Sequence, residues 1–269
     1  MNGNLFIKEM KRNTFSLAIW MVVITILITI TMSVYNIFLE NQSKVMGMMS
    51  LIPKGALQFK GVSNFNDLFS VLGFYAVNNI IYMMVLGSIF AIVLSSNILL
   101  KEEYNKTAEY LLSWPLSRRE IFLTKLAAYS LNVFLLNLVT ALAGFICIEL
   151  VKKGPVNFSS FLILSLYTFL LNMLFGAVGL FLSVMIKRPR PITTLCIGLV
   201  LIMYFVYTLS KITESISEIG YLSPFKFVNM EVSNPAYRIE FLNLAYFVVL
   251  SLLLIMSSYR LYLRRDIYT

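Results

Sequence analysis

Six long apolar runs separate the polar stretches of this chain. An α-helix needs about 20 mainly apolar residues to cross the hydrocarbon core of a bilayer. The first run, residues 15–38, contains no charged residue and is longer than the apolar region of a signal peptide, so we expect an uncleaved first helix. The pattern predicts an all-α membrane protein with one transmembrane domain and six spanning helices, at residues 15–38, 71–100, 121–150, 158–186, 192–210 and 241–259.

The stretches between these runs differ in length and character. Residues 40–70 and 211–240 are two long polar loops that contain both proline and glycine. Residues 1–14 place lysine and arginine beside leucine, isoleucine, phenylalanine and methionine. That composition is typical of a basic amphipathic helix that lies in the membrane interface. We therefore expect a short interfacial helix before the first span.

Positive charge is distributed unevenly along the chain. Most of the 22 lysine and arginine residues lie in the N-terminal segment, in residues 101–125, in the turn 187–191 and in the C-terminal tail. Cytoplasmic loops of membrane proteins carry an excess of these residues. We therefore expect a multi-pass protein of the plasma membrane, with both termini and residues 101–125 in the cytoplasm and the two long loops outside. This distribution accounts for the formal net charge of +9 without a nucleic-acid partner.

Residues 101–125 form the longest charged stretch between two apolar runs. Apolar or small residues recur at helical spacing from Tyr104 to Leu112, and the charged residues fall largely on the other side. Pro115 ends this helix, because proline lacks an N–H and restricts the residue before it. Ser117 then begins the capping-box pattern S-R-R-E, which opens the third span. The sequence thus predicts a short amphipathic helix at the membrane surface that turns at a proline.

The sequence offers few residues for catalysis. It contains no histidine, and its two cysteines lie inside apolar runs. The glycine-rich P-loop of nucleotide-binding proteins and the G-x-S-x-G motif of serine hydrolases are both absent from it. We therefore expect no catalytic residue, bound cofactor or metal ion in this chain. Energy for any transport would come from another polypeptide.

Charged residues are also scarce within the spans. Trimmed to their apolar cores, the six spans are read as free of charged residues, whereas ion-coupled transporters usually bury one. Glu149 is the nearest candidate, and its place at a helix end favours the interface. Small residues recur on two spans in a pattern typical of closely packed helices. They are Gly87, Ala91 and Ser95 on the second span and Gly176, Gly179 and Ser183 on the fourth.

The stretch from Glu103 to Lys125 resembles the cytoplasmic loop of ABC-2-type transporter permeases. The shared features are Glu103, the T-A-E-Y-L-L-S run that starts at Thr107, the P-L-S-R run that starts at Pro115, and Lys125. The match is with the branch that includes sodium-efflux and copper-maturation (Nos-type) permeases, although Lys106 stands where that family commonly has glycine. The six-span layout, the basic N-terminal segment and the R-R-D-I tail from Arg264 are similar as well.

This resemblance implies a mechanism and partners. In such permeases the cytoplasmic loop, here residues 101–120, is a coupling helix that docks on a separate ATP-binding subunit, which holds ATP and magnesium. Two ATP-binding subunits and a second permease copy, identical or related, would complete the assembly in its membrane lipids. The implied docking residues are Glu103, Thr107, Leu111, Leu112, Pro115 and Arg118, with Lys125 at the membrane end.

Residues that line a transport pathway are harder to identify from sequence. The spans offer neutral polar side chains that suit an amphipathic substrate such as a hydrophobic peptide or a lipid-like compound, although each could equally form an interhelical hydrogen bond. The alternatives to a permease are a non-transporting scaffold or immunity protein and a membrane-embedded lipid-modifying enzyme. The candidate pathway residues are Asn78, Asn132, Asn137, Tyr204 and Tyr207.

Overall fold

A computed structural model describes residues 2–50, 68–104, 116–186, 189–212, 214–230, 232 and 237–264. All regular secondary structure in this part of the chain is helical, which confirms the all-α prediction. The α-helices are α1 (Gly3–Ser33), α2 (Tyr35–Glu40), α3 (Gln42–Ser50), α5 (Val71–Tyr104), α7 (Arg118–Val151), α8 (Phe158–Met185), α9 (Pro189–Ile212) and α10 (Phe241–Arg264). Two 3-10 helices, η2 (Glu214–Leu222) and η3 (Pro224–Phe227), lie between α9 and α10.

Six helical segments are long and apolar enough to cross a membrane, as the hydrophobic pattern predicts. They are α1 with α2, α5, α7, α8, α9 and α10. Several extend beyond their predicted spans, because polar residues can continue a helix into the aqueous phase. The helix α7, for example, has 34 residues and is therefore about 50 Å long, against roughly 30 Å of hydrocarbon core.

The N-terminal segment differs from its prediction. Helix α1 begins at Gly3, where the Asn2 side chain accepts a hydrogen bond from the Leu5 N–H at 3.1 Å, and continues without a break to Ser33. No separate interfacial helix precedes the first span. The reason is that the sequence places neither proline nor a further glycine in this stretch, and one buried stripe continues along it. The stripe runs through Leu5, Glu9, Asn13, Leu17, Ile24, Ile28 and Met32.

The two long loops contain more helix than their polar composition indicates. Part of 40–70 forms α3, and much of 211–240 forms η2 and η3. The η2 segment folds back on the end of α9, where a Cβ on Gly220 would lie 2.4 Å from the Ser210 hydroxyl oxygen. Phe225 of η3 is fully buried and packs against the ring of Phe175 on α8. These contacts fix the loop to the bundle.

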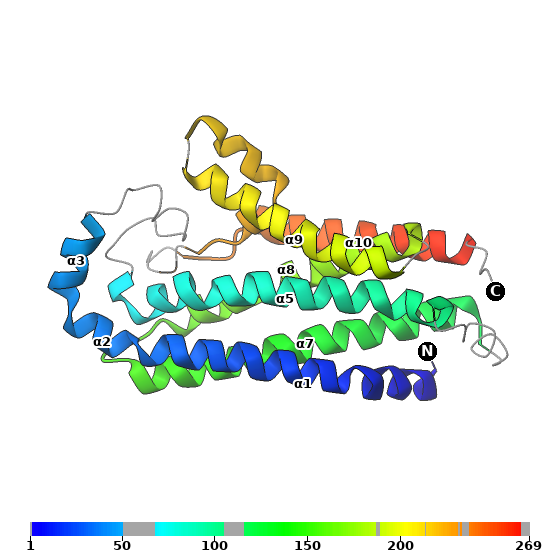
Figure 1. Cartoon of the computed structure of the whole chain (residues 1–269), viewed down its shortest axis with the longest axis horizontal. Coiled ribbons are helices and arrows are strands. Elements are labelled where there is room, and N and C mark those ends of the chain that lie inside the picture. Colours follow the sequence, from blue (N-terminus) through cyan, green and yellow to red (C-terminus); the bar gives the residue numbers. More distant parts are fainter. Residues whose placement is uncertain are drawn as a thin grey trace.

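Helices α5 and α8 form the centre of the bundle, with α1 packed on α7, α9 on α5 and α10 on α8 (Figure 1). Small residues bring α5 and α8 together, as their spacing predicts. A Cβ on Gly179 would lie 2.2 Å from the Ser95 hydroxyl oxygen and 2.5 Å from the Ile92 carbonyl oxygen. Gly87 likewise leaves room for Asn172, whose amide nitrogen would lie 2.6 Å from an added Cβ.

The ends of the helices define two ends of the bundle. The start of α1, the end of α5, the start of α7 and the end of α10 lie together, and α3 lies at the opposite end (Figure 1). Both ends of the described chain are therefore on one side of the bundle, as six spans require. The predicted coupling segment, residues 101–120, connects α5 to α7 at this same end.

Candidate functional site

The structure describes the backbone of the two helix ends that flank the predicted coupling segment. Glu103 belongs to the last turn of α5, and Arg118 is the first residue of α7. The other predicted docking residues, Thr107, Leu111, Leu112 and Pro115, lie outside the described residues. Their docking role stays a prediction. What the structure adds is the set of contacts that hold the two flanking helix ends.

A capping box starts α7, as the S-R-R-E pattern predicts. The Ser117 hydroxyl accepts a hydrogen bond from the Glu120 N–H at 3.2 Å, and the Glu120 carboxylate accepts one from the Ser117 N–H at 3.0 Å. Two N–H groups that the helix itself cannot pair are thereby satisfied. The chain consequently enters α7 at a fixed residue near the end of the coupling segment.

The first turns of α7 are also attached to the end of α10. The Arg119 Nε donates a hydrogen bond to the Tyr259 hydroxyl at 2.8 Å. One turn further on, the Phe122 ring packs edge-on against Tyr259 at 5.4 Å between ring centroids and contacts Tyr262 at 5.6 Å. The start of α7 is thus held on its α10 side by both a polar and an aromatic contact.

Charged side chains are buried on the α1 side of the same end. The side chains of Glu9 and Lys125 are each 1% exposed, and the Lys125 Nζ lies 3.8 Å from a Glu9 carboxylate oxygen. The Lys125 Nζ also donates a hydrogen bond to the carbonyl oxygen of Ile98 on α5. The Arg12 guanidinium contacts both Glu9 carboxylate oxygens, at 2.6 and 2.7 Å.

This cluster shows how a charged residue is accommodated beside the apolar core of the third span. Lys125 lies within the predicted span 121–150, and its pairing with Glu9 explains how an ammonium group is accommodated there. A signal for Glu9 was present in the sequence, because it lies four residues from both Leu5 and Asn13 on the buried stripe of α1. Among the side chains whose burial the structure describes, Glu9 and Lys125 are the only charged ones that are buried.

A chain of neutral polar side chains crosses the centre of the bundle. The Ser88 hydroxyl of α5 donates to the Asn172 side-chain oxygen at 3.2 Å, and the Asn172 amide donates to the Asn137 side-chain oxygen at 3.1 Å. The Asn137 amide in turn donates to the Val133 carbonyl oxygen at 2.8 Å. These bonds connect α5, α8 and α7, which is the interhelical role that asparagine commonly has in membranes.

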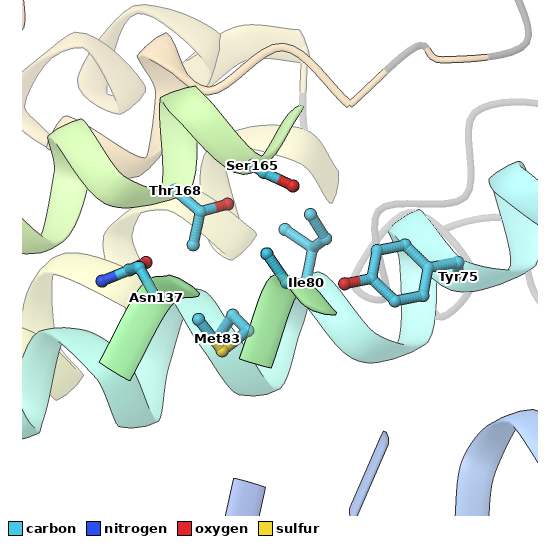
Figure 2. Close-up of a pocket in the computed structure, with 7 residues that line it drawn as sticks. Tyr75, Ile80, Met83, Asn137, Ser165 and Thr168 are labelled. Carbon is cyan, nitrogen blue, oxygen red and sulfur yellow. The ribbon is translucent and has the colours of Figure 1, made fainter. Parts of the chain in front are cut away.

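A small cavity lies beside this polar chain. Figure 2 shows the Tyr75 hydroxyl pointing toward the other labelled lining residues from α5, α7 and α8. The cavity measures about 10 Å³, which is room for roughly one water molecule. It is therefore too small to hold a peptide or lipid substrate. Its lining is formed by Tyr75, Ile80, Met83, Asn137, Ala141, Ser165 and Thr168.

The structure does not gather the five candidate pathway residues at one place. Asn137 lines the cavity, whereas the Asn78 and Asn132 amides donate to carbonyl oxygens of their own helices, at 3.1 and 2.7 Å. Tyr204 and Tyr207 both lie against the ring of Phe225 in the loop after α9. Each of these residues thus has a packing or hydrogen-bonding role within one bundle.

Comparison with protein families identifies the chain. The model of the ABC-2 family transporter proteins matches residues 3–267, nearly the whole chain. The chain belongs to the ABC-2 transporter family. Together with the six apolar helices, membership of the ABC-2 family makes it a multi-pass membrane component of an ABC transporter rather than a catalytic subunit. The comparison with curated proteins found no match to this chain.

Within the ABC-2 family, membrane components generally work with an ATP-binding subunit. The match includes the end of α5, the start of α7 and the segment between them. The described residues contain no group of three or more cysteine, aspartate or glutamate side chains placed to hold a metal ion.

Proposed function

We propose that this chain is the membrane-spanning permease subunit of an ATP-driven exporter in the plasma membrane. The observation that carries the proposal is the match to the ABC-2 family across residues 3–267. Since the sequence has no P-loop, the ATP and magnesium sites belong to a separate subunit, of which two copies bind the assembly. A second permease copy, identical or related, completes the pathway.

The docking site for the ATP-binding subunit is the segment 101–120. This segment joins α5 to α7 directly, so a displacement of the segment acts on the ends of both helices. Its amphipathic pattern also fits a helix that lies on lipid headgroups. Docking is favoured because the glutamates on its polar face would be repelled by an anionic inner leaflet.

The proposed substrate is amphipathic, such as a hydrophobic peptide or a lipid-like compound. Glu9 and Lys125, which pair near one end, are the charged side chains found buried among those whose burial the structure describes. A bare ion would find mainly neutral polar groups there, several already hydrogen-bonded to one another, to replace its hydration shell, and an unpaired ion at membrane depth is costly. The cavity described among α5, α7 and α8 has room for only about one water molecule, so we place the pathway at the face shared with the second permease copy.

Purification of the tagged chain from its native membrane tests this function. We expect an ATPase with a P-loop to be recovered with the chain. After reconstitution in liposomes, ATP hydrolysis by the complex should rise with hydrophobic peptides or lipid-like compounds and respond little to sodium. A sodium-dependent flux without stimulation by any amphiphile would contradict the substrate assignment. Recovery without any ATPase would favour a scaffold or immunity protein.

Cysteine labelling tests the orientation that the charge distribution predicts. In a background that lacks Cys147 and Cys196, cysteines at Ser43 and Ser217 should react with an impermeant maleimide in intact cells. A cysteine at Ser113, in the coupling segment, should react only after permeabilisation. Reaction of the Ser113 variant in intact cells would place the segment outside and exclude its docking to a cytoplasmic ATPase.

A further inference from the structure

One buried cation connects three helices at the end of the bundle that carries the coupling segment. The Lys125 Nζ on α7 lies 3.8 Å from the Glu9 carboxylate on α1 and donates to the Ile98 carbonyl oxygen on α5. A second bond joins α1 to α7 nearby, from the Asn2 N–H to the Thr124 hydroxyl oxygen at 3.1 Å. The beginning of α1 is thus attached to both helices that flank the segment.

This contact lies close to both helix ends that the coupling segment connects. Ile98 lies within about two turns of the end of α5, and Lys125 lies about two turns after the start of α7. The coupling segment leaves from one of these helix ends and returns to the other. Any displacement of the segment therefore acts on the two helices that Lys125 holds to α1.

Helix packing alone does not require a buried ion pair. Removing two charges from water is costly, and an apolar pair of similar volume often stabilises a fold equally well. This pair keeps further polar partners, because Arg12 contacts the Glu9 carboxylate and the Ile98 carbonyl accepts from Lys125. Such directional bonds fix the relative placement of helices in a way that two apolar side chains do not.

We propose that Glu9 and Lys125 are positioning residues that transmit movement of the coupling segment to α1. The part of the proposal that concerns movement rests on the proposed function. The contact moves α1 together with the ends of α5 and α7 when the ATP-binding subunit displaces the segment. Without the contact, α5 and α7 still respond, but α1, held by its apolar packing and the Asn2–Thr124 bond, follows them less closely.

Four variants distinguish a role in transmitting movement to α1 from a role in folding. Lys125→Met removes the charge and the donor, whereas Lys125→Arg keeps both and serves as the conservative rescue. The double variant Glu9→Leu with Lys125→Leu removes both charges of the pair, so no unpaired charge of the pair stays buried. It is used if the single variant does not fold. Lys152→Met is the matched control, because Lys152 pairs with Glu149 at 2.6 Å on an exposed site at the other end of α7.

The first measurement uses the permease alone in lipid nanodiscs. Spin labels at the exposed positions Lys11 on α1 and Leu123 on α7, in a background without native cysteines, report the distance between the two helices. We expect a narrow distance distribution for the wild-type chain, Lys125→Arg and Lys152→Met, and a broader or displaced one for Lys125→Met. An unchanged distribution in Lys125→Met and in the double leucine variant overturns the proposal.

The second measurement uses the complex with its ATPase. Amphiphile-stimulated hydrolysis should fall about tenfold in Lys125→Met, a size typical of coupling between two sites, while the ATPase is still recovered with the chain. Lys125→Arg and Lys152→Met should keep the wild-type response. Normal stimulation in a variant with a broadened α1–α7 distance overturns the transmission role. If the wild-type chain recovers no ATPase, the proposed function fails, and the spin-label distances alone decide whether Glu9 and Lys125 hold α1.

Discussion

Replacing Gly179 with leucine is expected to prevent the bundle from folding. Gly179 lies where α8 closely approaches α5, and an added Cβ would lie 2.5 Å from the Ile92 carbonyl oxygen. That oxygen belongs to the helix backbone, so it cannot turn away as a side chain would. The cost should exceed the roughly 1–3 kcal/mol of ordinary overpacking in a core. The readout is the yield of monodisperse protein in size-exclusion chromatography after mild detergent extraction.

The matched control is leucine at Gly198. This glycine lies on α9, and an added Cβ would meet no atom within 4 Å. We expect Gly198→Leu to give a wild-type yield, because glycine is a poor helix former and its replacement on an open face carries no steric cost. A monodisperse Gly179→Leu protein at wild-type yield would show that α5 and α8 can separate, against the packing described above.

The positions of the spans could be predicted because each depends on local composition alone. A run of about 20 apolar residues can satisfy its backbone in a membrane only as a helix, so the six runs determine the six spanning segments. The capping box at Ser117 was predictable for the same reason, since its two partners are three residues apart. The small residues around Gly179 predicted that another helix would pack closely against α8, but the sequence did not show that this helix would be α5.

The start of α1 was predicted incorrectly for an equally local reason. Lysine and arginine beside apolar residues favour a helix in the membrane interface, but they do not end that helix. Because nothing between Gly3 and Ser33 breaks the helix, the basic segment and the first span form one element. Its buried stripe packs on α7, which a single sequence cannot show.

The contacts of the candidate site could not be predicted, because they join residues that are far apart in the sequence. Glu9 and Lys125 each have the position of a charge at a helix end, and only the fold shows that they meet. The same holds for Asn137 and Asn172, whose type predicts an interhelical hydrogen bond but not its partner. The ion pair lies within about two helical turns of the start of α7, so it leaves the argument for an amphipathic substrate in place.

Replacing Leu111 and Leu112 together with serine should separate the permease from its ATPase. Both leucines lie on the apolar side of the predicted coupling helix, in the part of the chain outside the described residues. Burying a leucine side chain contributes about 1.5–3 kcal/mol, so loss of two from a docking surface should weaken association by at least about 100-fold. Insertion should be normal, because neither residue lies in a span. Recovery of the ATPase with the tagged chain, together with stimulated hydrolysis, measures the effect.

Serine at both Met46 and Met48 is the control for this double variant. These methionines lie on α3, at the opposite end of the bundle, and are 40% and 68% exposed, so the same apolar-to-polar change occurs there away from the proposed docking segment. We expect this control to retain both the ATPase and its stimulation. If the Leu111 and Leu112 variant also retains both, the segment is a surface helix on the lipid headgroups. The ATP-binding subunit would then have to act on another cytoplasmic part of the chain.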